Sequence, residues 1–83
     1  MMKQAEGVVF GRRLRELRNR ERMTQADLAE AAGLTSLYIS NVENGFAVPS
    51  LTTILRLALA LKCKVATMMA VFDKQDLERL FHS

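Results

Sequence analysis

The stretch TSLYISNVENG, at residues 35–45, concentrates small hydrogen-bonding side chains in one short segment. Its apolar residues Ile39 and Val42 are three positions apart, which is the spacing of a buried helix face. The other faces carry hydroxyl and amide groups, which belong to Ser36, Tyr38, Ser40 and Asn41. Such groups recognise a partner by hydrogen bonding, and an asparagine amide can bind the edge of adenine with two hydrogen bonds. This face is therefore the first candidate for a recognition surface.

The sequence offers little for catalysis. The only histidine, His82, is the penultimate residue, where we expect a frayed tail. The only cysteine, Cys63, lies in the apolar run LALALKCKV without an adjacent base, so we expect a residue in or near the core. There is no His/Cys cluster for a metal and no glycine-rich phosphate loop. We therefore predict no enzymatic activity, no cofactor, no metal site and no small-molecule ligand.

Positive charge is concentrated near the N-terminus. The net charge is +3, and residues 23–55 contain no Lys or Arg. Residues 12–22, in contrast, carry Arg12, Arg13, Arg15, Arg18, Arg20 and Arg22. Such a cluster suits a polyanionic partner, although the same arginines would also serve as a solvated helix face.

Length and composition are typical of one globular domain over residues 1–83. Hydrophobic residues make up 49% of the chain and charged residues 25%. The single cysteine fits a reducing compartment. We see no secretory signal and no apolar run long enough to cross a bilayer, so we expect a cytoplasmic protein without a membrane partner.

Hydrophobic spacing predicts a series of short helices. Phe10, Leu14 and Leu17 form one stripe of a helix over residues 8–21. Thr24, three residues before Asp27, predicts a capping box that starts a helix over residues 25–32. Gly33 is the expected left-handed end of that helix, and the next helix, capped by Thr35 or Ser36, ends at the Asn44-Gly45 pair.

The C-terminal half continues the helical pattern. Pro49 and Ser50 precede a helix over residues 51–61 whose inner stripe we expect to be Leu51, Ile54, Leu55, Ala58 and Leu61. A fifth helix follows over residues 65–72, and Asp73 starts a short last helix. No alternating strand pattern is present. The predicted fold class is all-α, a compact arrangement of five helices with a short C-terminal helical tail.

Residues 24–45 have the pattern of a helix-turn-helix unit, which is two helices joined by a tight corner at Gly33. Small Ala29 lies in the first helix near the corner, where the second helix must approach closely. In such units the second helix enters the major groove of DNA with its polar side chains against the bases. The hydrogen-bonding face of residues 35–43 fits this use.

The segments LRELR, TQADLA, GLTSLYISNVENG and PSLTTILRLALAL have the order and spacing of a known family. Over residues 10–69 the chain resembles the Cro/C1-type (XRE-like, lambda-repressor-like) helix-turn-helix regulators. Its size and extra C-terminal helix also resemble restriction–modification controller proteins, which are short dimeric members of that family. The resemblance implies a sequence-specific transcriptional regulator that binds double-stranded DNA with helix 35–43 in the major groove.

The resemblance also assigns roles to individual residues. It implies base contacts by Thr35, Ser36, Leu37, Ser40 and Asn41, of which Ser36 and Asn41 are the strongest candidates. Exposed Leu37 would touch a thymine methyl, or would instead pack against a neighbouring helix or a partner. Phosphate contacts are expected from Arg12, Arg13, Gln25, Tyr38 and Asn44. The alternatives are a plain polar role in the first helical turn for Gln25 and partial burial for Tyr38.

The family pattern bears on four further positions. Arg18 and Glu43 are expected to form a structural ion pair. Phe46 stands where Lys or Arg is frequent, which removes one expected phosphate contact. Arg22 stands where glycine is common, so we expect a mildly strained left-handed residue there.

A dimer is expected because one recognition helix covers few base pairs, whereas two copies can read a palindromic operator. The predicted dimerisation segment is residues 65–81, with Met68, Phe72 and Leu77 at the interface. Val65 and Met69 could equally close the core of the monomer. The alternative function is an antitoxin or coactivator-like protein-interaction module, because the same fold supports such binding.

Overall fold

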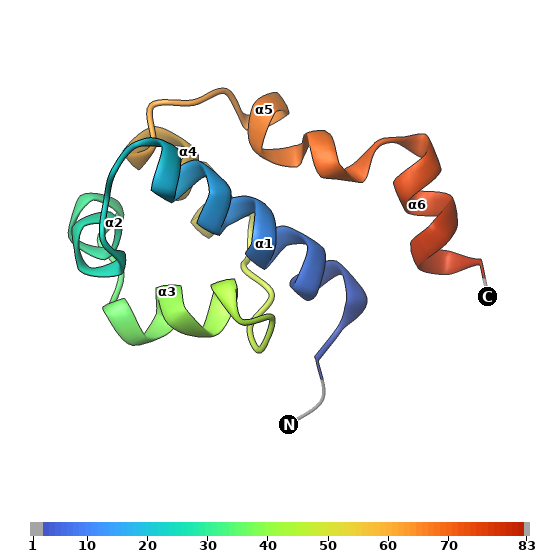
Figure 1. Cartoon of the computed structure of the whole chain (residues 1–83), viewed down its shortest axis with the longest axis horizontal. Helices are drawn as coiled ribbons and strands as arrows, with labels where there is room; N and C mark the ends of the chain where they lie inside the picture. The colour runs from blue at the N-terminus through green and yellow to red at the C-terminus, as the bar shows by residue number, and fades with distance from the viewer. Residues whose placement is uncertain (1–2, 83) are drawn as a thin grey trace.

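The computed structural model describes residues 3–82, and every regular element in that range is helical (Figure 1). The helices are α1 (Ala5–Arg20), α2 (Gln25–Ala32), α3 (Ser36–Glu43), α4 (Leu51–Ala60) and α5 (Val65–Met69). A short 3-10 helix, η1 (Ala70–Phe72), joins α5 to the last helix, α6 (Lys74–Phe81). The predicted all-α fold of five helices with a helical tail is confirmed.

Side-chain caps mark the beginnings of α2, α3 and α4. The Thr24 hydroxyl accepts a hydrogen bond from the Asp27 amide at 3.0 Å, and the Asp27 carboxylate accepts one from the Thr24 amide at 2.9 Å. This is the predicted capping box of α2. Thr35 and Ser50 cap α3 and α4 in the same way, by accepting from the amide three residues further on.

Four helix ends in residues 3–82 turn through left-handed residues, and two of these turns flank α2. Gly33 ends α2 with a φ of 70°, which a glycine adopts without steric cost. Arg22 has a φ of 57° after α1, as expected from the arginine at a position that favours glycine. These two turns set the paths of the chain into α2 and α3.

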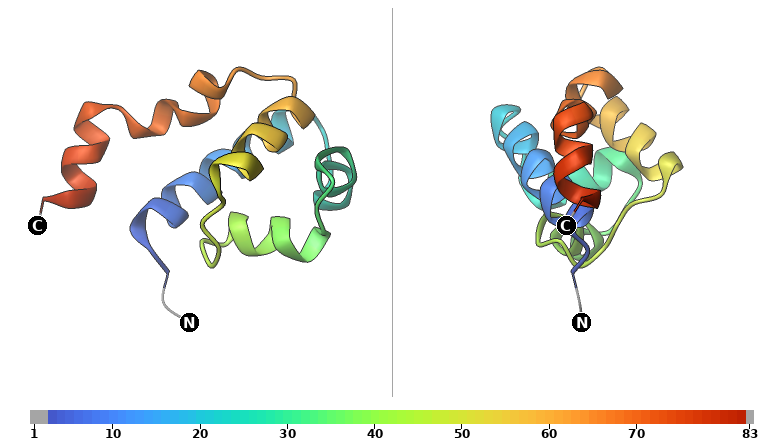
Figure 2. Two further views of the ribbon diagram at one scale, coloured as in Figure 1. Left: turned by 180° about the vertical axis from the view of Figure 1, so that it is seen from behind. Right: turned by 90° about the vertical axis from the view of Figure 1, so that its right-hand side faces the viewer.

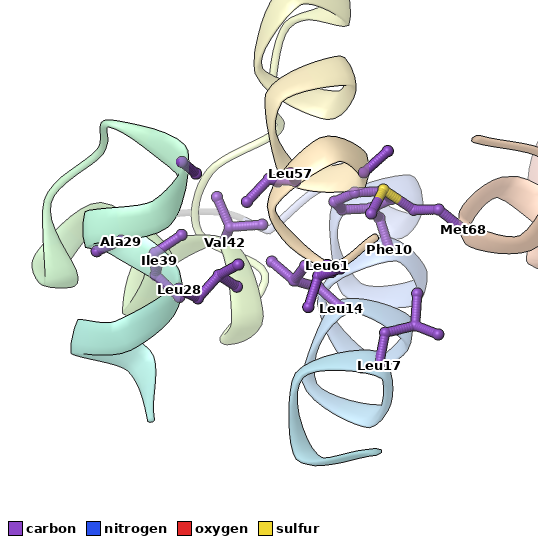
Figure 3. Close-up of a cluster of buried hydrophobic side chains, with 12 residues drawn as sticks. Phe10, Leu14, Leu17, Leu28, Ala29, Ile39, Val42, Leu57, Leu61 and Met68 are labelled. Atoms are coloured by element: carbon purple, nitrogen blue, oxygen red, sulfur yellow. The ribbon is translucent and has the colours of Figure 1, made fainter. Parts of the chain in front are cut away.

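The core lies between α1, α2, α3 and α4, and α5 closes one side of it (Figures 2 and 3). The largest fully buried side chains are Leu14, Leu28, Ile39, Val42, Leu57, Leu61 and Met68. Helix α6 lies at the far end of the molecule from α2 and contacts the rest of the chain chiefly through η1 (Figure 1). The tail is therefore much less covered than the other helices.

The predicted inner stripe of α4 is only partly right. Ala58 and Leu61 are buried, but the side chains of Leu51 and Leu55 are 69% and 49% exposed. Leu57, which lies outside the predicted stripe, has no exposed surface. Leucine or isoleucine occurs on most sides of this helix, so its spacing alone does not decide which side turns inward.

The prediction that Met68 lies at an interface between two copies is wrong. Its side chain has no exposed surface and packs in the core beside Phe10 (Figure 3). The reason is that α5 folds back onto α1 and α4, which turns Met68 inward. Met69 also packs against the core, whereas Val65 is 37% exposed.

Candidate nucleic-acid interface

The turn at Gly33 places α3 against α2 with its apolar side inward. Ile39 and Val42 of α3 have no exposed surface, and Ala29 of α2, at 3% exposure, allows the two helices to approach. Leu34, in the turn, also packs against the core. The inner side of α3 is thereby fixed, and its opposite side faces away from the protein.

The outward side of α3 carries most of the residues expected to contact bases. Ser36 is exposed, and Leu37 is 70% exposed, so Leu37 does not pack against another helix of the same copy. Ser40 and Asn41 are half-buried, and the Thr35 hydroxyl caps α3. These side chains form one surface along the helix, in which the only large apolar group is Leu37.

Tyr38 is half-buried, and its ring packs against the core. This position corresponds to the alternative of partial burial that the sequence left open. The backbone carbonyl of Asn41 accepts hydrogen bonds from the amides of Phe46 and Ala47 at 2.8 and 3.2 Å. The loop after α3 is therefore tied back to the helix.

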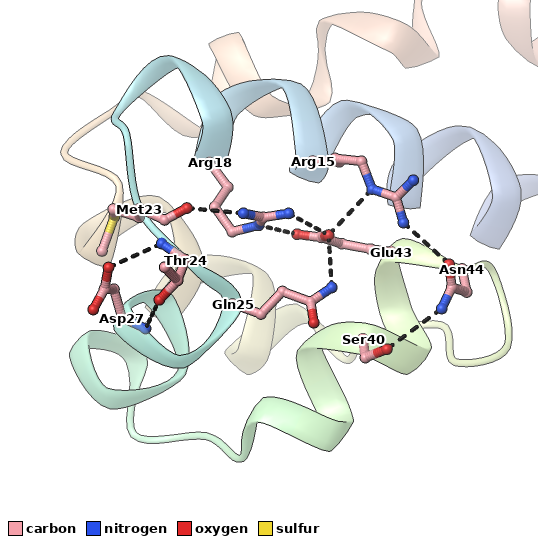
Figure 4. A network of polar contacts seen from close by, with 9 residues as sticks. All are labelled: Arg15, Arg18, Met23, Thr24, Gln25, Asp27, Ser40, Glu43 and Asn44. Atoms are coloured by element: carbon pink, nitrogen blue, oxygen red, sulfur yellow. Dashed lines mark hydrogen bonds and ion pairs between the residues drawn. The ribbon is translucent and has the colours of Figure 1, made fainter.

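A buried carboxylate holds the C-terminal end of α3 against α1 and α2 (Figure 4). The Glu43 side chain has no exposed surface. The expected pair with Arg18 is present: Arg18 Nε donates to Oε2 at 2.6 Å and Nη2 donates to Oε1 at 3.0 Å. Gln25 Nε2 and Arg15 Nε also donate to Oε1, at 3.1 and 3.3 Å. We call these four residues the Glu43 cluster.

The Glu43 carboxylate and the Arg18 guanidinium stay ionised at neutral pH. Burial acts most strongly on the pKa of Glu43, in the upward direction, but the hydrogen bonds from Arg18 and Gln25 outweigh it. The net result is a pKa below the usual range of a glutamate. The hydrogen bond to Glu43 raises the pKa of Arg18, so both partners keep their charges.

Gly11 brings α1 close to the end of α3. A Cβ at this position would clash with the carbonyl oxygen of Val42 and lie 2.7 Å from that of Glu43. Arg15 and Arg18 follow Gly11 at intervals of four and three residues, so all three lie on one side of α1. The absence of a side chain at Gly11 lets the two arginines reach the carboxylate.

The residues expected to contact phosphate have different surroundings. Arg12 is exposed on α1, and Asn44 is exposed at the end of α3, where its Nδ2 donates to Ser40 Oγ at 3.4 Å. Gln25 belongs to the Glu43 cluster. Arg13 is directed toward α5 instead, because its Nε and Nη2 donate to the carbonyl of Thr67 at 3.2 and 2.8 Å. We therefore withdraw Arg13 as a phosphate contact and assign it to the packing of α5.

Arg15 is a site residue that the sequence reasoning missed. Besides its contact with Glu43, its Nη2 donates to Asn44 Oδ1 at 3.0 Å. The sequence feature that could have identified Arg15 is its helical spacing, which puts it on the same side of α1 as Gly11 and Arg18. The loop after α3 contains no Lys or Arg. A cation from another segment lies against it, because Lys3 Nζ is 4.6 Å from the centre of the Phe46 ring.

Metal-binding clusters and membrane-spanning helices are both absent from residues 3–82. No group of three or more His, Cys, Asp or Glu side chains in this range is placed to hold a metal ion. None of the helices in the same range is long and apolar enough to span a membrane. Half-buried Cys63 packs against the core, and burial raises the pKa of its thiol, which reduces its reactivity at neutral pH.

Two short helices joined at a left-handed glycine, with an exposed polar side on the second, define a helix-turn-helix domain. The sequence pattern of the family described as "Helix-turn-helix domain" matches residues 9–70. The chain belongs to this family and is a helix-turn-helix regulator of the Cro/C1 (XRE-like) type.

Known proteins resemble the chain in sequence and in structure. The HTH-type transcriptional regulator RghRB of Bacillus subtilis is 42% identical over 62 residues, which are 74% of this chain and 45% of that protein. The chain thus spans about half the length of this relative. The restriction–modification controller protein C.AhdI of Aeromonas hydrophila is 42% identical, with a TM-score of 0.75 over 77% of this chain and 97% of that chain. The P22 c2 repressor, solved with a synthetic operator, is 29% identical, with a TM-score of 0.66 over 71% and 89% of the two chains.

Proposed function

We propose that the protein binds specific DNA sequences as a transcriptional regulator, with α3 in the major groove. The observation that carries the proposal is the outward side of α3, where hydrogen-bonding side chains are presented on a helix whose inner side is fixed by the core and by the Glu43 cluster. A rigid helix with such groups can read base edges. The similarity to the P22 c2 repressor, which was solved with an operator, supports this use.

The proposed roles follow the exposure of each side chain. Ser36 and Asn41 contact base edges, and the Asn41 amide is suited to adenine. Exposed Leu37 contacts a thymine methyl. Thr35, at the N-cap of α3, and Ser40, next to Asn41, complete this surface.

Contacts to the DNA backbone would come from Arg12, Gln25, Asn44 and the hydroxyl of Tyr38. They would fix the register of α3 without reading sequence. On this proposal residues 1–83 act as one DNA-binding domain with its helix-turn-helix unit at residues 24–45, in the cytoplasm. The similarity to C.AhdI supports a narrower proposal, that the protein is a restriction–modification controller.

We also propose that two copies associate through their C-terminal tails and that the resulting dimer binds a palindromic operator with its two α3 helices. Residues of α1, α4, α6, η1 and the loop before α4 line an apolar groove of about 280 Å³, among them Phe10, Val48, Ile54, Phe72, Leu77 and Phe81. Leu77 is 43% exposed and Phe81 is 72% exposed. An isolated helix as short as α6 is not stable in water, so its apolar side needs cover that a second copy can provide.

The DNA-binding proposal is tested by selecting a binding site from a pool of random duplexes and then measuring affinity by fluorescence anisotropy. The Asn41→Ala variant should bind the selected duplex about 10-fold to 100-fold more weakly, since a good bidentate contact to a base discriminates by about 1–3 kcal/mol. Its affinity for an unrelated duplex should not change. The control is Gln75→Ala, which removes an exposed amide from α6. A folded wild-type protein that selects no sequence would refute the proposal and direct attention to a protein partner.

A further inference from the structure

The Glu43 cluster carries a net positive charge. Two guanidinium groups, on Arg15 and Arg18, face the single carboxylate of Glu43. The fourth member, Gln25, adds no charge. Because the carboxylate stays ionised, one unit of positive charge remains at this end of α3.

Arg18 is fully used inside the protein. Its Nε and Nη2 bind both oxygens of Glu43, and its Nη1 donates to the carbonyl of Met23 at 2.8 Å. Its side chain is only 12% exposed. Arg18 therefore has no free edge for a ligand outside the protein.

Arg15 is held more loosely. Its contact of 3.3 Å is the longest that the Glu43 carboxylate makes, and it goes to an oxygen that already accepts from Arg18 and Gln25. The side chain of Arg15 is 48% exposed. The hydrogen bonds found within residues 3–82 use its Nε and Nη2 and leave Nη1 for a ligand from outside.

The exposed guanidinium lies at the edge of the recognition surface. Arg15 Nη2 donates to Asn44 Oδ1, and Asn44 Nδ2 donates to Ser40 Oγ (Figure 4). These hydrogen bonds link α1 to the outward side of α3. They also restrict the long side chain of Arg15 before any ligand arrives, which lowers the entropy lost on binding.

We propose that Arg15 binds a phosphate of the DNA backbone when α3 lies in the major groove. This inference rests on the proposed function. A guanidinium group with a free edge matches the oxygens of a phosphodiester and stays charged at any physiological pH. The contact to Glu43 through Nε need not break, because Nη1 is the atom that faces the ligand.

The test compares the salt dependence of DNA binding among variants that differ in one charge. Arg15→Gln removes the charge but keeps an amide for Asn44. Arg15→Lys keeps the charge but loses the planar fork. The matched control is Arg20→Gln, because Arg20 is exposed on the same helix, nine residues from Gly11 and so on the opposite side from α3. Affinity for the selected duplex and for an unrelated duplex is measured between low and moderate salt, and thermal unfolding is recorded for each variant.

Arg15→Gln should reduce the slope of log K against log salt concentration by about 0.9 for each copy bound, since each neutralised phosphate contributes about that much. The reduction should be equal on both duplexes, Arg15→Lys should restore the slope, and Arg20→Gln should leave it unchanged. Equal slopes for Arg15→Gln and Arg20→Gln, in a wild-type protein that selects a DNA sequence, would overturn this inference alone. So would a large loss of thermal stability in Arg15→Gln, which would make Arg15 a structural residue. A wild-type protein that binds no duplex would overturn the proposed function as well.

Discussion

Removal of Arg18 should destabilise the fold far more than removal of a neighbouring exposed arginine. In an Arg18→Met variant the aliphatic stem is largely kept, while three hydrogen bonds are lost: two to Glu43 and one to the Met23 carbonyl. The Glu43 carboxylate, which has no exposed surface, is then left with Arg15 and Gln25 as its partners. Both of these partners bind the same oxygen, so Oε2 loses its only recorded donor within residues 3–82.

The expected loss is about 3 kcal/mol. Removing one partner of a buried ion pair costs about 3–5 kcal/mol, and the lower end applies because two donors remain on Glu43. For a domain of this size, 1 kcal/mol shifts the melting temperature by about 4–8 °C, so the variant should melt roughly 12–24 °C below the wild type. Arg20→Met, on an exposed side of the same helix, should change the free energy of unfolding by less than about 0.5 kcal/mol.

The stability lost in Arg18→Met should also depend on pH, in a direction set by the pKa of Glu43. In the wild type the folded-state pKa of Glu43 is lowered, so its contribution to stability is present above the unfolded-state pKa and is lost as pH falls through the folded-state pKa. Without Arg18, burial is no longer outweighed, and the pKa of Glu43 moves upward. In mild acid the folded variant takes up a proton on Glu43, which removes the unpaired buried charge and stabilises the folded state. The difference in stability between the two proteins should therefore shrink as pH falls from 7 to 4.

Urea denaturation followed by circular dichroism at pH 7 and pH 4 measures both quantities. Arg20→Met, measured in parallel, corrects for the general effect of acid on an arginine-rich helix. The reasoning is refuted if Arg18→Met costs less than about 1 kcal/mol at pH 7, where a buried pair should cost about 3 kcal/mol or more. It is also refuted if the cost is the same at both pH values, because Glu43 would then not be the group that Arg18 stabilises.

Two further predictions concern close packing and assembly. Gly11→Ala should cost about 3 kcal/mol in urea denaturation, the upper end for overpacking, because its Cβ would meet backbone carbonyls of α3. Gly7→Ala, whose Cβ would lie 3.2 Å from a Val48 methyl group and 3.3 Å from the Gly45 carbonyl oxygen, should cost much less, because both contacts need only a small adjustment and alanine favours the helix by about 1 kcal/mol. Equal losses at the two glycines would contradict the close approach of α1 to α3. Leu77→Asp should convert a dimer into a monomer in sedimentation equilibrium, whereas Leu59→Asp, on the exposed side of α4 away from the groove, should not. A wild-type protein that is monomeric at tens of micromolar, or a dimer broken only by Leu59→Asp, would exclude the proposed interface.

Local features of the fold could be predicted from the sequence because their causes lie within a few residues. The Thr24 and Asp27 side chains cap α2 through amides three positions away, and Gly33 supplies the left-handed residue that ends it. The expectation of a left-handed Arg22 came instead from the family resemblance, because glycine is common at that position. The paired roles of Arg18 and Glu43, 25 positions apart, came from the family resemblance and not from spacing.

Contacts between distant segments could not be predicted from the sequence. The arginine cluster looks uniform as a sequence, yet Arg13 binds the Thr67 carbonyl, 54 positions away, while Arg15 reaches Asn44, 29 positions away. Which element a helical side chain faces can be stated only when the neighbours of its helix are known. The spacing of apolar residues gave no means of choosing among these partners.

The sequence by itself determined the helices, their caps and the polar composition of α3, because hydrogen bonding along the backbone and helical periodicity are local. Only the tertiary structure decided which apolar side chains are core and which remain exposed. Met68 is buried because α5 folds back onto α1 and α4, and Leu55 is 49% exposed because α4 turns Leu57 and Ala58 toward the core instead. Such packing depends on shape complementarity between whole helices. The tertiary structure also decided that Arg13 hydrogen-bonds to α5 whereas Arg15 hydrogen-bonds to Asn44 at the end of α3.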